Sequence, residues 1–187
     1  MNIEALVYDL SRDPFNPDLN FDLAEEYLAL NQTASAVSFY LRCAEYSNKA
    51  NNKAYFSLLR MAQCFEDQKG REYSVSNCFY QALAYDDTRP EAYFKLSQYH
   101  EKAGNWQEAY TFAVLGLGWA QYEDPELSHK VGYFGDYCLL FQKYVAAWWI
   151  GRKNESLEGL RELSQNPMNQ MYIDAVAYNL EKLDAVL

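Results

Sequence analysis

The sequence has little positive charge and almost no histidine. Sixteen lysines and arginines stand against 26 aspartates and glutamates, which gives a formal net charge of −10 at pH 7. Because phosphate binding requires clustered Lys and Arg side chains, this balance argues against a nucleic-acid-binding protein. An acidic surface suits a basic or neutral protein partner, although acidity also serves plain solubility.

Long apolar runs are missing as well. Nowhere do roughly 18 apolar residues follow one another, the length that a helix needs to cross a bilayer. The first ten residues contain no basic region and no extended apolar segment, so they do not resemble a secretory signal. We therefore expect no membrane association, and a location in the cytoplasm or in a particle that assembles there.

The four cysteines and two histidines lack the spacing of a metal or catalytic site. No C-x-x-C pair occurs, and each cysteine lies in an apolar helical pattern, which predicts reduced thiols in a core. His100 falls where a packed side chain is expected. His129 lies next to Ser128, but no G-x-S-x-G motif surrounds the pair. We predict no catalytic residue, no metal site and no cofactor, and hence a protein that is not an enzyme.

What the sequence does contain is helical punctuation. Apolar residues recur at spacings of three and four, and sustained alternation is absent, so we predict an all-α protein. Capping side chains and prolines predict helix starts at Pro17, Pro90 and Pro125. Helix stops are predicted at Asn31, Gly70 and Gly104. The capping-box spacing from Asn105 to Glu108 predicts that a new helix begins directly after Gly104.

Small side chains recur at fixed intervals in three successive segments. They stand at Ala24, Ala62 and Ser97, then about twelve residues later at Ala36, Val75 and Ala109, and seven further on at Cys43, Ala82 and Gly116. Small residues at such places let two helices approach closely and let the next hairpin pack between them. The pattern therefore predicts a stack of helical hairpins.

The segment 90–109 closely resembles a tetratricopeptide repeat (TPR), with Leu96, Ser97, Gly104 and Ala109 on signature positions. Residues 17–50 and 55–89 look like two further copies, and the third hairpin extends over 90–123. The usual bulky residue of the first helix falls on Asn20, Leu58 and Tyr93, so the first copy departs from the pattern. The resemblance implies a right-handed α-solenoid of TPR-like hairpins in one domain, residues 1–187.

Beyond residue 120 the repeat register breaks, and we expect a degenerate repeat and capping helices over 124–187. An irregular stretch at 121–136 should precede a long apolar helix at 137–150. An amphipathic capping helix is expected at 170–187. Its apolar face should carry Tyr172, Ile173, Val176, Leu180 and Leu183.

Trp148 and Trp149 are neighbours and would point about 100° apart on a helix. Either this helix is covered on two sides, or one tryptophan contributes to an interface with another copy or another protein. The surrounding run 139–151, together with Glu155 and Ser156, also looks like a helical region found beside family 2 glycosyltransferases in some bacterial and phage proteins. No nucleotide-sugar-binding half is present, so this resemblance implies no transferase chemistry.

TPR arrays bind extended peptides or helices on a concave groove formed by the first helix of each hairpin, and the resemblance implies the same surface here. The corresponding residues are Phe21, Glu25, Leu28, Leu59, Gln63, Glu66, Phe94, Gln98 and Glu101. Apolar anchors among carboxylates predict a partner segment that is apolar with basic flanks. Alternatively, Phe21, Leu59 and Phe94 simply pack against neighbouring hairpins.

Chaperone-binding members of the family clamp a C-terminal carboxylate with basic and amide side chains at set groove positions. This chain has Phe21, Glu25, Arg60, Glu91 and Lys95 there. Because only two of the five are basic, a chaperone co-factor is disfavoured.

These observations predict a non-enzymatic protein-interaction module or assembly scaffold that binds a segment of another protein. Two other functions stay open at this point. One is an accessory protein of a glycosyltransferase or glycan-modifying system, and the other is a structural component of a viral or phage particle.

Overall fold

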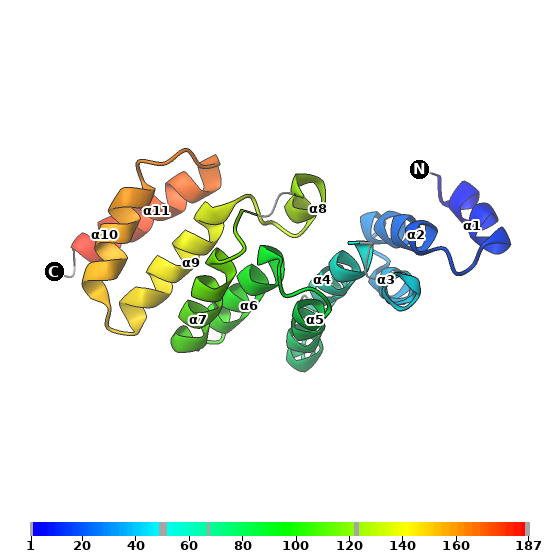
Figure 1. The fold of residues 1–187 in the computed structure, drawn as a ribbon, viewed down its shortest axis with the longest axis horizontal. Helices are drawn as coiled ribbons and strands as arrows, with labels where there is room; N and C mark the ends of the chain where they lie inside the picture. The colour runs from blue at the N-terminus through cyan, green and yellow to red at the C-terminus, as the bar shows by residue number, and fades with distance from the viewer. Residues whose placement is uncertain (1, 49–51, 67, 122–123, 186–187) are drawn as a thin grey trace. The chain divides into compact units, whose positions relative to one another are not determined.

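The computed structural model describes residues 2–48, 52–66, 68–121 and 124–185, and these are all-α (Figure 1). Eleven helices lie in the described part of the chain, packed as sequential antiparallel pairs. The chain divides into two compact units, Met1–Asp87 and Thr88–Leu187. The predicted all-α class is therefore confirmed.

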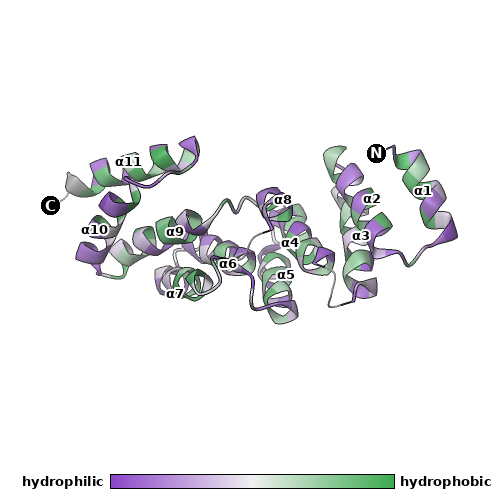
Figure 2. Ribbon diagram, turned by 45° about the horizontal axis from the view of Figure 1, so that its top comes forward, coloured by the Kyte–Doolittle hydropathy of each residue, from purple (hydrophilic) through white to green (hydrophobic). Residues whose placement is uncertain are grey.

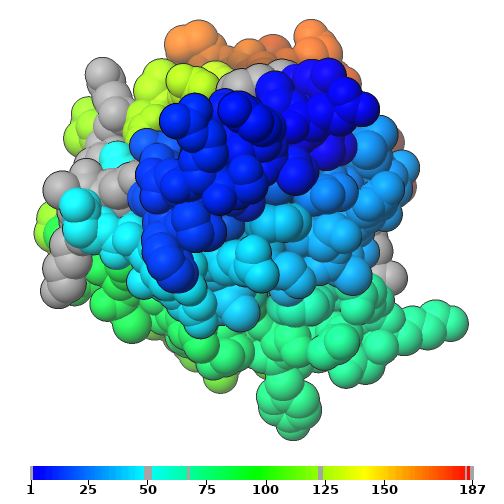
Figure 3. Space-filling model, turned by 90° about the vertical axis from the view of Figure 1, so that its right-hand side faces the viewer, coloured from blue at the N-terminus to red at the C-terminus, as the bar shows by residue number. Residues whose placement is uncertain are grey.

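The first unit contains five helices. They are α1 (Ile3–Arg12), α2 (Pro17–Ala29), α3 (Thr33–Tyr46), α4 (Lys53–Glu66) and α5 (Glu72–Tyr85). α2 pairs with α3 and α4 pairs with α5, while α3 packs against α4 and α2 also contacts α4. α1 lies outermost on the face of this unit that Figure 3 shows, against the atoms of α2 and α3.

The second unit contains six helices. They are α6 (Pro90–Lys102), α7 (Trp106–Leu117), α8 (Pro125–Lys130), α9 (Asp136–Trp149), α10 (Lys153–Leu163) and α11 (Gln170–Asp184). α7 packs between α6 and α9, and α10 packs between α9 and α11. α6 and α11 also contact α9 directly, so these three helices lie near one another on one side of the unit.

The predicted helix boundaries are confirmed. α2, α6 and α8 begin at their prolines, and the Asn16 side chain accepts hydrogen bonds from the backbone N–H groups of Asp18 and Leu19 at 3.0 and 3.1 Å. Gly70 and Gly104 both have φ of 75°, a left-handed conformation that glycine adopts without steric cost. α7 begins at Trp106 as predicted, but the Asn105 side chain does not cap it.

The small residues occupy helix crossings, as their spacing predicts. Ala24, Ala36, Ala62, Ala82 and Ala109 are all fully buried. Between α6 and α7 the Ser97 hydroxyl donates a 2.8 Å hydrogen bond to the backbone carbonyl of Ala109, so two of the repeated small positions touch. These contacts hold each hairpin together.

Asn20, the residue at which the first hairpin departs from the repeat pattern, has a structural role of its own. Its side chain is fully buried at the position where the repeat usually has a bulky residue. The amide donates hydrogen bonds to the carbonyls of Pro14 and Asn16, at 3.2 and 2.8 Å, and so holds the turn between α1 and α2. α1 itself buries Leu6 and Leu10 against Leu23 of α2.

Two expectations for the C-terminal region need correction. The stretch 121–136 is not wholly irregular, because the helix α8 forms within it. On α11, Tyr172 and Val176 are buried, but Ile173 is 42 % exposed and so does not belong to the covered face. Green and purple residues alternate along α11 in Figure 2, in keeping with a helix that is only partly covered. The end of the expected helix, residues 186–187, lies outside the described residues.

No helix in the described ranges combines the length and the apolar character that crossing a membrane requires.

Gly116 generates a test of the close approach between α6, α7 and α9. A Cβ atom on this residue would lie 2.7 Å from the Cβ of Tyr93 and 2.9 Å from a methyl carbon of Leu139. Gly116→Ala should therefore overfill the contact and lower the free energy of unfolding by about 1–3 kcal/mol, measured by urea denaturation.

Gly118→Ala is the matched control, because Gly118 is exposed and its added Cβ would meet only a carbonyl oxygen at 3.3 Å. Its effect should stay within about 0.5 kcal/mol. Equal effects of the two substitutions would contradict the packing described for Gly116.

Candidate protein-binding surfaces

The nine residues predicted to bind a partner divide into a buried and an accessible group. Phe21, Leu59 and Phe94 are 2 %, 0 % and 1 % exposed, so their side chains belong to the cores of their units. This burial favours the alternative that they pack within the array. The other six lie at the surface or half-buried: Glu25, Leu28, Gln63, Glu66, Gln98 and Glu101.

In the first unit, Glu25, Leu28, Gln63 and Glu66 come from the neighbouring helices α2 and α4, and we refer to them as the α2–α4 surface. Leu28 and Gln63 are half-buried, whereas Glu66 is exposed. A partner that reached this surface would contact carboxylates, an amide and one leucine.

Glu25 is already engaged inside the unit. The Arg60 Nε donates to the Glu25 Oε1 at 2.8 Å, and the Tyr40 hydroxyl donates to the same carboxylate oxygen. Arg60 also donates a 2.7 Å hydrogen bond from Nη1 to the Gln63 Oε1. Arg60 therefore connects α2, α3 and α4, and the charge of Glu25 is largely balanced before any partner arrives.

The pKa values of this cluster agree with its geometry. Burial raises the pKa of Tyr40, and the Glu25 carboxylate adds to that effect, so the hydroxyl stays protonated and able to donate. Burial alone would lower the pKa of Arg60, but the negative charge of Glu25 and the hydrogen bonds to Tyr40 and Glu25 outweigh burial and raise it. The guanidinium is therefore held in its charged form.

In the second unit, Gln98 and Glu101 lie half-buried on α6, and we refer to them as the α6 surface. Burial raises the pKa of Glu101, while a hydrogen bond from the Gln142 side chain on α9 acts in the opposite direction. A carboxylate with a raised pKa is destabilising in its ionised form, because it loses hydration that its neighbours do not fully replace.

The start of α6 carries a buried ion pair. Arg89 and Glu91 are both fully buried, with Nη2 and Oε1 2.8 Å apart. Ser128 of α8 donates to the same Glu91 oxygen at 2.5 Å, and Asp124, just before α8, lies 3.5 Å from Arg89 Nη1. These polar contacts fasten α8 to α6. They also remove Glu91 from any groove, in agreement with the disfavoured carboxylate clamp.

The segment that follows α8 covers a predicted anchor. The rings of Tyr133 and Phe94 lie 5.6 Å apart, so Tyr133 packs where the resemblance would place a ligand side chain. Ser128 has its hydroxyl on Glu91 rather than on His129, and the His129 ring packs against Phe134 instead. This arrangement does not form the serine–histidine pairing that catalysis requires.

His100, the four cysteines and Trp149, which the sequence analysis considered as possible functional residues, all pack against other side chains. His100 stacks on Phe112 with ring centroids 5.4 Å apart, and all four cysteines are buried and free. No cluster of three or more possible metal ligands occurs among the residues that the structure describes. Trp149 is 61 % exposed and stacks on Trp106, so self-association through this residue stays a prediction.

The hairpin architecture is that of tetratricopeptide repeat proteins. YrrB, described as a TPR protein with an unusual peptide-binding site, superimposes with a TM-score of 0.68 at 16 % identity, over 99 % of this chain and 84 % of its own. MamA matches with a TM-score of 0.63 at 15 % identity, over 87 % of this chain and 85 % of its own. PilW, described as a type IV pilus biogenesis factor, matches with a TM-score of 0.62 at 16 % identity, over 87 % of this chain and 68 % of its own.

At these identities the likeness establishes the fold alone. No protein-family model matches the sequence, and no curated protein matches it either. The expected kinship of the C-terminal third with helical regions of glycosyltransferase proteins finds no support in these comparisons.

Sequence reasoning missed the partners of the predicted residues. Tyr40 contacts Glu25 from the second helix of the same hairpin, whereas Gln142 and Ser128 contact Glu101 and Glu91 from helices farther along the chain. A repeat pattern identifies which helix face a residue occupies, but it contains no signal for a hydrogen bond that joins one repeat to an insertion.

Arg89 provides a test of the polar attachment of α8. Arg89→Met leaves the buried Glu91 carboxylate without its cation and should lower the free energy of unfolding by about 3–5 kcal/mol, measured by chemical denaturation. Adding Glu91→Gln should recover part of the loss, because no uncompensated buried charge then remains. Arg161→Met, at an exposed position of α10, serves as the control. A small effect of Arg89→Met would show that the ion pair is not buried as described.

Glu101 predicts a pH dependence with a defined sign. Because its pKa is raised in the folded state, the ionised carboxylate costs stability as the pH rises above the ordinary glutamate value of about 4.3. Glu101→Gln should therefore be more stable than the parent at neutral pH, and the difference should disappear in acid. Thermal unfolding across this pH range measures it, and a parent that is the more stable at neutral pH would contradict the assignment.

Proposed function

We propose that this chain is a non-enzymatic protein-interaction module with a separate binding surface for a protein segment in each unit, the α2–α4 surface in the first and the α6 surface in the second. The observation that carries the proposal is Glu101, a half-buried carboxylate on α6 whose pKa is raised by burial. A protein gains no stability from keeping such a group ionised. Selection for binding would account for it, because functional sites often retain groups that cost stability.

The fold supports this proposal without specifying a partner. TPR-fold proteins act as protein-interaction scaffolds, and YrrB is a TPR protein with an unusual peptide-binding site. Because Phe21, Leu59 and Phe94 are buried, the half-buried Leu28 is the apolar side chain of the predicted set that a partner could reach. On each surface a carboxylate, Glu66 in the first unit and Glu101 in the second, then selects a basic flank of the segment bound there.

Charge reversal on each surface tests the proposal. The purified chain would first be used to select binders from a displayed library of random peptides, and a selected peptide would then be titrated by fluorescence anisotropy. A peptide bound at the α2–α4 surface should bind about threefold to tenfold more weakly to Glu66→Lys, and a peptide bound at the α6 surface should lose as much with Glu101→Lys. Each change removes an attraction and adds a repulsion to basic residues of the peptide. Raised salt should reduce the difference between variant and parent.

Glu45→Lys on α3 and Glu158→Lys on α10 are the matched controls, since both glutamates are exposed and lie outside the two surfaces. They change the net charge of the chain by the same amount as the test variants. If the controls weaken binding as strongly, the peptide responds only to overall charge and the proposal fails. Binding that survives both test variants would place the partner elsewhere on the chain.

A further inference from the structure

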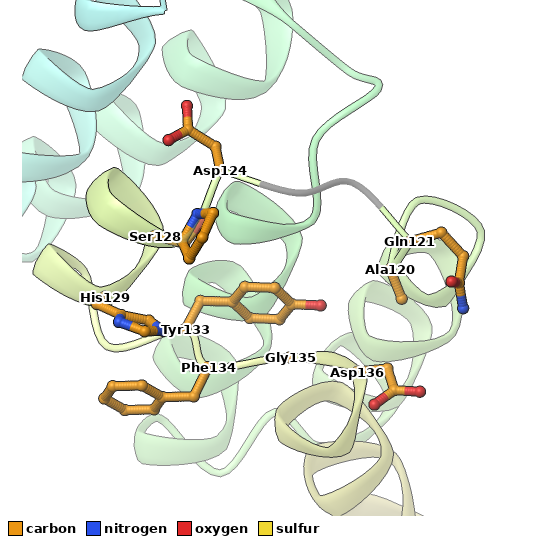
Figure 4. A pocket seen from close by; sticks show the side chains of 10 residues that line it. Ala120, Gln121, Asp124, Ser128, His129, Tyr133, Phe134, Gly135 and Asp136 are labelled. Atoms are coloured by element: carbon orange, nitrogen blue, oxygen red, sulfur yellow. The ribbon is translucent and has the colours of Figure 1, made fainter.

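A pocket of about 460 Å³ lies in the second unit, between the end of α7, α8 and the start of α9 (Figure 4). It belongs to neither the α2–α4 surface nor the α6 surface. One wall contains Ala120 and Gln121, and another contains Asp124, Pro125 and Ser128 of the α8 segment. The floor is formed by Tyr133 and by the residues that lead into α9. The TPR pattern has no counterpart of this pocket, because α8 is an addition to the hairpin register.

Tyr133 is the unusual member of the lining. Its side chain is 3 % exposed, and its hydroxyl has no hydrogen-bond partner within the described parts of the chain. In Figure 4 the ring extends across the pocket, and the hydroxyl points toward the side where Ala120, Gln121 and Asp136 are found. A buried hydroxyl without a partner costs about 1–3 kcal/mol, a cost that a suitably placed ligand would remove.

The charges around the hydroxyl are negative. Asp124 and Asp136 are the charged residues of the lining. Asp124 shares the buried Arg89 with Glu91, so one guanidinium already faces two carboxylates. Asp136, at the first turn of α9, is exposed toward solvent. Burial raises the pKa of Tyr133, and the charges of Glu91 and Asp136 contribute in the same direction, so the hydroxyl stays neutral.

The geometry points to a binding site for a positively charged nitrogen group, an alkylammonium or a guanidinium, between the Tyr133 hydroxyl and the Asp136 carboxylate. The hydroxyl oxygen can accept an N–H from such a group, and Asp136 balances its charge. An anion would instead meet two carboxylates, and an apolar ligand would leave the hydroxyl without a partner. The pocket volume of about 460 Å³ has room for one side chain or one small amine.

The walls of the pocket are fixed in a way that suits a preformed site. Ser128 is held on Glu91, and Tyr133 is packed on Phe94, so both side chains are held in place before a ligand arrives. The exposed Gln121 is free of such contacts in the described structure and is the lining side chain that can adjust to the ligand.

Capped amino acids test the site with the intact chain. N-acetyl-lysine methylamide and N-acetyl-arginine methylamide would be titrated by NMR, with the tyrosine rings labelled, and N-acetyl-norleucine methylamide would be the uncharged analogue. Cadaverine, a free diamine, forms a further arm that distinguishes a small amine from a peptide side chain. We expect at least one cationic probe to bind and norleucine to bind more weakly.

Two conservative variants locate the binding. Tyr133→Phe keeps the ring on Phe94 and should lower the affinity for the cationic probe by about tenfold, because a hydrogen bond to a charged group is lost. Asp136→Asn should lower the same affinity by about twofold to fivefold. Tyr178→Phe and Asp174→Asn, both exposed on α11, are the controls and should change nothing.

Unfolding without ligand separates this role from a structural one. Tyr133→Phe should unfold at the same or a higher temperature, since it removes a buried hydroxyl that has no partner. A marked loss of stability would indicate a structural hydrogen bond and overturn the proposal. Equal affinities for the norleucine and lysine probes would overturn the proposal as well. So would an affinity for the cationic probe that changes in neither Tyr133→Phe nor Asp136→Asn. These outcomes are independent of the peptide titration on the α2–α4 and α6 surfaces.

Discussion

The close approach of paired helices is the constraint on which this structure depends. Two helix backbones approach most closely where a residue with a small side chain lies between them. Ala24 and Ala36 satisfy this requirement in the first unit, and Ser97, Ala109 and Gly116 satisfy it in the second. Larger side chains then fill the spaces on either side. The surfaces that a partner could reach are consequences of these crossings.

The sequence is sufficient to predict the hairpins because their determinants are local and repeated. Prolines, glycines and small residues recur at intervals that are set by helix geometry, so Pro17, Gly104 and Ala109 could be assigned without a structure. The α8 helix has no repeat to reveal it. Its position depends on a buried contact between Ser128 and Glu91, which lie 37 residues apart, and no local pattern encodes such a pairing.

The repeat pattern predicts the helices of the candidate site but not the contacts that its side chains make. The repeat resemblance indicates which helix faces could meet a partner, and Glu25 and Glu101 do lie on such faces. Whether a side chain is available depends on its neighbours. Arg60 and Tyr40 contact Glu25 from two other helices, and Tyr133 packs on the ring of Phe94. Burial and pairing of this kind arise only after packing, so they are invisible to a pattern of residue types.

Asn20 illustrates how a departure from a repeat consensus can be informative. A bulky apolar residue at this position would join the interior, but it could not serve the two carbonyl groups of the turn before α2. The amide therefore couples the leading helix to the hairpin behind it, so that the two should open together under hydrogen exchange. In related arrays, a polar amide at the same point would mark a hairpin that has acquired an extra helix ahead of it.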